Sequence, residues 1–199
     1  MSNVPENNSA KTNLDGYEIL VCVCGGIAAF KAAAMTSMLV QHGCGVTVAM
    51  TKNARRFVGS VTFEGLTGRS VAVDMWKRRP PGVQHLDLSD RADLIIVAPA
   101  TANIIGKLAG GIADDLVSTL LLGADSPVLI APAMNERMWR HPATLRNVKW
   151  LRDNGFLFVD PAEGWQACRA VGVGRMAEPS IILEAIEKQL RSAPPKSRG

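Results

Sequence analysis

The chain has 199 residues, of which 47% are hydrophobic, 20% charged and 5% aromatic. This length and hydrophobic content predict one domain with a substantial core and exclude a largely disordered chain. The net charge of +4 arises mostly at the C-terminus, where Arg191, Lys196 and Arg198 occur without an acid. Because the rest is nearly neutral and poor in aromatic residues, we expect no nucleic-acid partner.

Membrane contact and secretion are not expected either. No apolar stretch approaches the roughly 18 residues that a transmembrane helix needs, and the polar N-terminus lacks the apolar region of a secretory signal. We therefore expect a cytoplasmic protein whose four cysteines are reduced. Cys22 and Cys44 are expected in the core. Cys22 and Cys24 have no second pair at zinc-ligand spacing, so no metal site is expected.

Strands and helices are predicted to alternate along the chain. In chain order, the pattern predicts a strand at 17–23, a helix at 27–42, a strand at 45–50, a helix at 53–66, a short strand at 70–74, a loop at 75–84, a strand at 93–100, helices at 101–110 and 114–122, a strand at 127–133, a helix at 142–154, a strand at 156–159, a mobile glycine-rich loop at 164–176 and a helix at 180–190.

This alternation predicts a parallel sheet covered on both faces. The expected fold is a three-layer, doubly wound, Rossmann-like (flavodoxin-like) α/β domain over residues 17–190, between flexible tails at 1–16 and 191–199. Ligands of such folds bind beyond the carboxyl ends of the strands, so candidate site residues are sought there.

The first strand ends in Cys24-Gly25-Gly26 and leads into a helix. The glycines allow the backbone to approach a ligand, and the start of the helix offers N–H groups to a phosphate. The segment has neither the glycine spacing of a dinucleotide site nor the lysine of a P-loop. A phosphate site and a turn without a ligand both fit these residues.

Two later strand ends resemble each other. The segments LIIVAPATAN at 94–103 and VLIAPAMN at 128–135 both run from a strand through Ala-Pro-Ala to an asparagine. We expect the proline to end each strand, because it cannot donate a ladder hydrogen bond. Thr101 and Asn103 could bind a polar cofactor ring or its sugar, and Asn135 a carboxylate or amide; the alternative is that Thr101 and Asn135 only cap helices. Two such turns at one sheet edge favour a binding site.

Two further side chains are candidates for acid–base chemistry. His85 lies just before the central strand, and Asp87 could orient it in an extended segment. Cys168 lies between glycines, close to Arg169 and Arg175, whose charges would lower the pKa of a nearby thiol. A structural histidine and an incidental exposed thiol are the alternatives.

Together, these segments resemble the flavin-dependent cysteine decarboxylases over about residues 17–190, most closely the branch that acts on 4′-phosphopantothenoylcysteine. The similar motifs are GGIAA at 25–29, HLDL at 85–88, PATAN at 99–103 and PAMN at 132–135 followed by Met138-Trp139. A fifth, from Ala167-Cys168 to Gly174-Arg175-Met176, is similar to the coenzyme A branch. The peptide-modifying branch lacks its cysteine.

The resemblance implies bound FMN and an assembly. It implies that FMN is held by Gly25, Gly26 and Ile27 with Thr51 and Lys52 at the phosphate end, and by Thr101, Ala102, Asn103 and Ala133 along the flavin. It also implies a homotrimer, or a dodecamer of trimers, with FMN between neighbouring subunits.

The implied reaction is decarboxylation of 4′-phosphopantothenoylcysteine to 4′-phosphopantetheine in coenzyme A biosynthesis. Transient oxidation of the substrate to a thioaldehyde provides the electron sink that carbon dioxide loss needs. By resemblance, His85 assists the first half, Cys168 supplies a proton in the final reduction, and the substrate is held by Asn135, Ala167 and Met176. Because the chain ends near 199, we expect a separate phosphopantothenate–cysteine ligase as pathway partner.

Three residues depart from the family's pattern. Cys24 stands where many relatives have serine, Arg169 where glycine is usual, and Ile104 where a polar residue is common. Three alternatives stay open: a flavin prenyltransferase, a peptidyl-cysteine decarboxylase and a non-catalytic flavoprotein that binds a partner. His85 and Cys168 argue against the first, Cys168 against the second, and retention of the site residues against the third.

Overall fold

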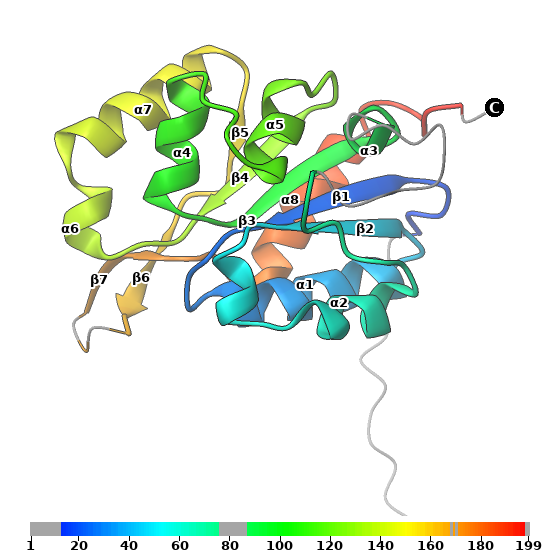
Figure 1. Cartoon of the computed structure of the whole chain (residues 1–199), viewed down its shortest axis with the longest axis horizontal. Helices are drawn as coiled ribbons and strands as arrows, with labels where there is room; N and C mark the ends of the chain where they lie inside the picture. The colour runs from blue at the N-terminus through cyan, green and yellow to red at the C-terminus, as the bar shows by residue number, and fades with distance from the viewer. Residues whose placement is uncertain (1–12, 76–86, 168, 170, 198–199) are drawn as a thin grey trace, which may run out of the picture.

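A five-stranded parallel sheet forms the centre of the molecule (Figure 1). The computed structural model describes residues 13–75, 87–167, 169 and 171–197. The strand order is β2-β1-β3-β4-β5, with bounds Glu18–Val23 for β1, Gly45–Met50 for β2, Leu94–Ala100 for β3, Val128–Pro132 for β4 and Leu157–Phe158 for β5. This order confirms the predicted flavodoxin-like fold, whose ligand site lies between β1 and β3.

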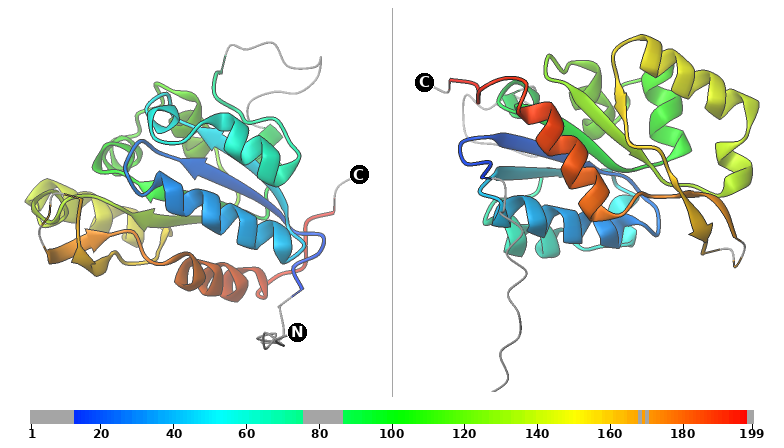
Figure 2. Two further views of the ribbon diagram at one scale, coloured as in Figure 1. Left: turned by 90° about the horizontal axis from the view of Figure 1, so that it is seen from below. Right: turned by 180° about the vertical axis from the view of Figure 1, so that it is seen from behind.

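Helices cover both faces of the sheet (Figures 1 and 2). One face carries α1 (Ala29–Gln41), α2 (Ser60–Thr67) and α8 (Pro179–Leu190). The other carries α4 (Ala102–Ala109), α5 (Leu116–Leu122) and α7 (Pro142–Asp153). Short helices lie at η1 (Ala54–Arg56), α3 (Asp87–Asp90) and α6 (Glu136–Trp139). In the described ranges, no helix combines the length and apolar character that crossing a membrane requires.

The central strand β3 divides the core in two. Every residue of β3 is buried, as expected of a parallel strand covered on both faces. Because side chains alternate along a strand, Ile96 and Ala98 pack into the core under α1 and α8, which includes Met35 and Ile186. Their neighbours Ile95 and Val97 pack into the second core, under α4 and α5.

Several predicted elements differ from the structure. The helix predicted at 53–66 is divided into η1 and α2 by an extended residue at Gly59, and α6 was not predicted. The strand predicted at 70–74 is reduced to one bridge between Ala49 and Ala72. Pro99 was expected to end its strand, but β3 continues to Ala100, with a shift in its pairing register to β4 between Val97 and Ala100. The loop predicted at 75–84 lies almost entirely outside the described residues.

The segment predicted as a glycine-rich loop contains two antiparallel strands instead. These are β6 (Ala162–Trp165) and β7 (Val171–Arg175), and their ribbon stands apart from the main sheet (Figure 1). Gly164 and Gly174 have φ values of +150° and +145°, a backbone conformation that favours glycine. These glycines therefore shape a ribbon, where the sequence pattern had suggested a loop.

The C-terminal segment after α8 contacts the body of the domain. The Tyr17 hydroxyl donates to the carbonyl oxygens of Leu190 and Ala193, at 3.1 and 2.9 Å. The backbone N–H of Lys196 donates to Asp93 at 2.7 Å. The polar composition of residues 191–199 gave no sign of these contacts.

Candidate functional site

A cavity of about 1140 Å³ lies at the carboxyl end of the sheet. Its wall is formed by the segments that follow β1, β2, β3 and β4 and by the β6–β7 ribbon. This is the place where a doubly wound sheet of this strand order binds ligands. Small-molecule sites commonly measure about 300–1,000 Å³, so the volume leaves room for a cofactor together with a substrate.

The cavity brings together predicted site residues from distant parts of the chain. All those assigned to cofactor or substrate binding line it: Gly25, Gly26, Ile27, Thr51, Lys52, Thr101, Ala102, Asn103, Ala133, Asn135, Ala167 and Met176. The predicted catalytic residues His85 and Cys168 lie outside the described residues. The individual roles stay predictions, but the clustering follows directly from the strand order.

The turn between β1 and α1 has the close approach that its glycines suggest. A Cβ added at Gly25 would lie 2.6 Å from the Asn53 Cβ atom and 2.8 Å from its carbonyl carbon, so no side chain fits there. The residue before α1, Ala28, provides no side-chain cap. The N–H groups of Ala29 and Lys31 already donate to the Gly26 and Ala28 carbonyl oxygens, at 3.0 Å each, so a phosphate at this turn would be met by the N–H groups beside them.

Among the described residues, four cationic side chains line the cavity, and three of them have an acidic partner. Lys31 and Arg175 both contact Glu178, each at 2.8 Å, and Lys107 has acidic partners of its own. The hydrogen bond from Lys31 lowers the pKa of the Glu178 carboxyl. Over the described ranges, Lys52 has no ion pair, which makes it the cation most suited to a phosphate.

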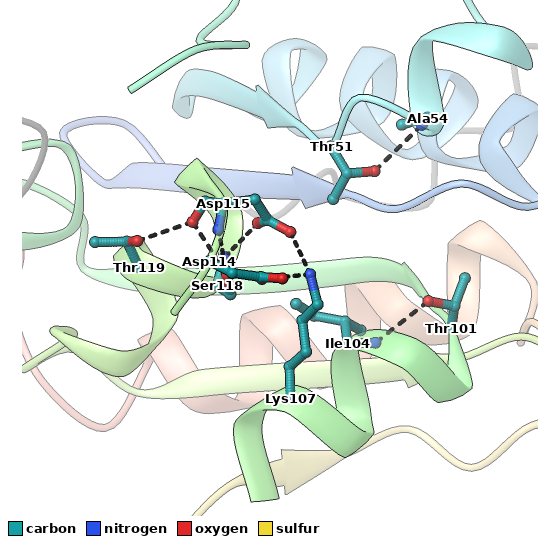
Figure 3. A network of polar contacts seen from close by, with 9 residues as sticks. All are labelled: Thr51, Ala54, Thr101, Ile104, Lys107, Asp114, Asp115, Ser118 and Thr119. Atoms are coloured by element: carbon teal, nitrogen blue, oxygen red, sulfur yellow. Dashed lines mark hydrogen bonds and ion pairs between the residues drawn. The ribbon is translucent and has the colours of Figure 1, made fainter. Parts of the chain in front are cut away.

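Lys107 joins α4 to the start of α5 at the cavity wall (Figure 3). Its Nζ atom lies 2.5 Å from Asp114 and 2.7 Å from Asp115. Asp115 also accepts a hydrogen bond from the Ser118 backbone N–H at 2.9 Å and so caps α5. Burial disfavours both charges, but these hydrogen bonds outweigh it, raising the pKa of Lys107 and lowering that of Asp115. Both groups are therefore charged at neutral pH.

Thr101 and Asn135 each cap a helix and also line the cavity. The Thr101 hydroxyl accepts from the Ile104 N–H at 3.4 Å, at the start of α4. The Asn135 side chain accepts from the Arg137 N–H at 2.9 Å, at the start of α6. Because the same residues contact the cavity, capping and ligand binding are compatible here and are not competing explanations.

The β6–β7 ribbon closes one side of the cavity against the turn that follows β4. The Met134 N–H donates to the Gly174 carbonyl oxygen at 2.9 Å. Gln166, buried to 7% exposure, makes further hydrogen bonds to this turn. The Met176 side chain is buried, whereas Trp165 is 62% exposed at the rim.

The cysteines that the structure describes do not supply a nucleophile. Cys22, Cys24 and Cys44 are free and buried, which confirms the predicted core positions of Cys22 and Cys44. Burial raises the pKa of Cys22 and brings that of Cys24 and Cys44 to about 12. Cys24 lines the cavity and is therefore a neutral thiol there.

Sequence reasoning missed several residues of the cavity wall. They are Phe30, Lys31, Asn53, Lys107, Asp114, Asp115, Trp165 and Gln166. Only Asp115 had a usable signal, since aspartate is a preferred residue at the start of a helix. Gln166 had no such signal in the sequence. Glutamine side chains are usually exposed, and Gln166 is buried only because the β6–β7 ribbon folds against the turn after β4.

Comparison with known proteins identifies relatives in coenzyme A biosynthesis. The model of the Flavoprotein family matches residues 7–191. The chain is 53% identical, over 88% of its length, to the coenzyme A biosynthesis bifunctional protein CoaBC of Bacillus subtilis. It is 43% identical over the same share to the protein of that name from Vibrio cholerae. The chain spans only 43% and 44% of these two relatives.

Solved structures share the fold over nearly their whole length. A PPC decarboxylase mutant complexed with pantothenoylaminoethenethiol superposes with a TM-score of 0.77 at 28% identity, covering 86% of this chain and 97% of that one. The FMN-dependent cysteine decarboxylase SpaF gives 0.76 at 31% identity, covering 88% and 96%. The FMN binding protein AtHal3 gives 0.76 at 28% identity, covering 89% and 98%. By family model, sequence and fold, the chain belongs to the Flavoprotein family.

Proposed function

We propose that this chain is an FMN-dependent phosphopantothenoylcysteine decarboxylase, which converts 4′-phosphopantothenoylcysteine to 4′-phosphopantetheine and carbon dioxide. The observation that carries the proposal is that all the described residues predicted to bind FMN or substrate line one cavity. Similarity to the bifunctional CoaBC proteins and to the PPC decarboxylase structure supports the same reaction.

The residues of the cavity fit FMN. Gly25 leaves no space for a side chain, so the backbone itself borders the cavity beside the uncapped start of α1. These N–H groups and Lys52 would hold the phosphate. Residues 101–103 and Ala133 would line the flavin. When bound, FMN supplies a two-electron oxidation of the substrate and its reversal, so that the overall reaction is redox-neutral.

The substrate would lie between the flavin and the ribbon. The Asn135 amide would hold the carboxylate that departs, while Ala167 and Met176 contact the rest of the molecule. Because the Met134–Gly174 hydrogen bond holds the ribbon against this end of the cavity, the ribbon would also exclude water from the reacting atoms.

We assign proton transfer to the two residues that lie outside the described ranges. His85 would handle a proton or position the substrate in the oxidative half of the reaction. Cys168 would donate a proton in the reductive half, and the adjacent Arg169 would favour its thiolate once the proton has left.

The assembly is proposed to be a homotrimer, or a dodecamer of trimers, with FMN between subunits. Ile27 and Phe30 line the cavity and are 62% and 61% exposed; a neighbouring subunit would cover them. The pathway would require a phosphopantothenate–cysteine ligase, in another domain or protein, to supply the substrate. We propose the cytoplasm as the place of action.

Mass spectrometry of the product tests the proposal directly. The FMN-loaded protein is mixed with 4′-phosphopantothenoylcysteine without oxygen. Loss of carbon dioxide alone is expected, because the substrate is oxidised and reduced again. Loss of carbon dioxide together with two hydrogens would favour the peptidyl-cysteine type of reaction and contradict the role of Cys168. Unchanged substrate with FMN bound would reject the decarboxylase and bring forward the prenyltransferase and binding-partner alternatives.

A histidine variant provides the matched control. His85→Asn should lower turnover by about 10²–10⁴-fold, the range typical of a lost acid–base group, and should keep its FMN. His141→Asn should retain turnover, because His141 caps α7 and does not line the cavity. Equal turnover in both variants would contradict a catalytic His85.

A further inference from the structure

Gln166 is a buried amide at the junction of the ribbon and the cavity. It follows β6 directly, is 7% exposed and lines the cavity. A buried glutamine must satisfy its polar atoms within the protein. Its hydrogen-bond partners therefore reveal what the side chain organises.

Two backbone groups determine which way the Gln166 amide faces. Its Nε2 atom donates to the Val173 carbonyl oxygen at 3.2 Å, and its Oε1 atom accepts from the Glu136 N–H at 3.3 Å. A carbonyl oxygen only accepts and a backbone N–H only donates. If the oxygen and nitrogen of the Gln166 amide were exchanged, its oxygen would face the Val173 carbonyl oxygen and its nitrogen would face the Glu136 N–H. Neither pair could form a hydrogen bond.

The orientation of Gln166 is passed on to Asn135. The Asn135 Nδ2 atom donates to Gln166 Oε1 at 3.4 Å. At the other end of the amide, Asn135 accepts the N–H of Arg137 at 2.9 Å through Oδ1. Gln166 thus holds the nitrogen of the Asn135 amide and the Arg137 N–H holds its oxygen. Gln166 is in turn held by backbone groups of Val173 and Glu136.

We propose that Gln166 is a positioning residue that keeps the nitrogen of the Asn135 amide on the ribbon side of the cavity. The proposal rests on the proposed function, in which Asn135 holds the substrate carboxylate. A carboxylate accepts hydrogen bonds and is repelled by an amide oxygen. With Gln166 in place, Asn135 meets the carboxylate with its donor end, so that Gln166 supports recognition of the group that is later lost.

The role of Gln166 in carboxylate recognition can be measured from the affinities of two unreactive substrate analogues, one with and one without the carboxylate. The probes are 4′-phosphopantothenoylserine, which keeps the carboxylate but has no thiol to oxidise, and 4′-phosphopantothenoylethanolamine, which lacks the carboxylate. Both are titrated into FMN-loaded protein by calorimetry. Gln166→Met keeps the approximate volume and removes the amide. We expect it to lower the preference for the serine analogue about tenfold, because the Asn135 amide is no longer held by Gln166 with its donor end toward the carboxylate.

Two comparisons separate positioning from a general effect on the ribbon. Gln41→Met alters an exposed glutamine on α1 and should leave the preference unchanged. In an Asn135→Ala background, Gln166→Met should have no further effect on the preference, since the residue through which it acts is gone. A full effect of Gln166→Met in that background, or an equal loss of affinity for both probes, would overturn the proposal.

A spectroscopic readout keeps this proposal separate from the decarboxylase assignment. The Asn135 side-chain NH₂ resonances, identified by their absence from Asn135→Ala, should shift in Gln166→Met and not in Gln41→Met. If wild-type protein binds neither probe, the proposed function fails, and these resonances still test Gln166. Unshifted resonances in Gln166→Met would overturn the positioning role.

Discussion

At the scale of single residues, Gly25 and Gly26 look alike in the sequence but have different surroundings. A Cβ at Gly25 would lie 2.6 Å from the Asn53 Cβ atom, whereas the nearest atom to a Cβ at Gly26 is the Thr101 Cγ2 at 3.8 Å. The first separation requires the backbone to shift, and the second is an ordinary contact. Substitution of Gly26 is therefore a control for the same substitution at Gly25.

We expect Gly25→Ala to lower the free energy of unfolding by about 1–3 kcal/mol, as overpacking of a tight site does. It should also weaken FMN binding, because the turn moves away from the cofactor. Gly26→Ala should change the free energy of unfolding by less than about 0.5 kcal/mol. Urea unfolding of the FMN-free variants measures both values. If Gly25→Ala had the same free energy of unfolding as Gly26→Ala and the wild type, the turn would accommodate a side chain at residue 25 without a loss of stability.

At the scale of elements, the ribbon is attached to the turn after β4 by a glycine that tolerates no side chain. A Cβ at Gly174 would lie 2.2 Å from the Met134 carbonyl oxygen, and its φ of +145° already disfavours a side chain. At Gly172, on the same strand, the nearest atom is the Glu136 Oε2 at 2.2 Å, the end of a flexible side chain. Gly172 is therefore the control position.

Gly174→Ala should detach the ribbon and leave the main sheet intact. We expect trypsin to cleave at Arg169 and Arg175 at least about tenfold faster than in wild type, because cleavage depends on local opening. FMN should remain bound through the turns after β1 and β3, while the proposed decarboxylation falls. Gly172→Ala should resemble wild type in limited proteolysis. Loss of FMN or of the whole fold in Gly174→Ala would show that the ribbon is part of the cooperative core.

At the scale of the whole molecule, the reactivity of two buried thiols can show whether the two halves of the core unfold together. Cys22 belongs to the core under α4 and α5, and Cys44 to the core under α1 and α8. Burial raises the pKa of Cys44 from 9.0 to about 12 and that of Cys22 well above 9.0. Because folding raises these pKa values, the thiols favour the folded state below about pH 9 and lose this contribution as the pH rises beyond it.

In a background with Cys24→Ser and Cys168→Ser, where Cys22 and Cys44 are the remaining thiols, Ellman's reagent should modify these two at pH 8 only through unfolding of the chain. For Cys44, a pKa raised from 9.0 to about 12 lowers the thiolate fraction about 1,000-fold; for Cys22 the pKa is raised in the same direction, and burial blocks access to both thiols. Both thiols should become reactive at the same urea concentration, because the two cores share one sheet. If Cys44 reacted at a lower urea concentration than Cys22, the two faces would unfold separately.

The fold was largely predictable because its elements depend on local pattern. Runs such as 94–100 are apolar at every position, and Gly43, with a φ of +89°, ends α1 as predicted. The errors occurred where contacts between distant segments decide the structure. The ribbon consists of residues of β6 and β7 that pair, such as Gly164 with Gly172, and β3 continues past Pro99 because Ala100 pairs with Pro132 of β4.

Local sequence pattern was enough to predict most strands and helices along the chain and the motifs at the strand ends, because periodicity and turn residues act over a few positions. How those motifs meet depends on the tertiary structure: the strand order places Gly25, Thr101 and Asn135 on one cavity. Tertiary structure alone also decided the partners of Lys107 and Gln166. Hydrogen-bond partners depend on distances in space, and the spacing of residues along a chain does not contain them.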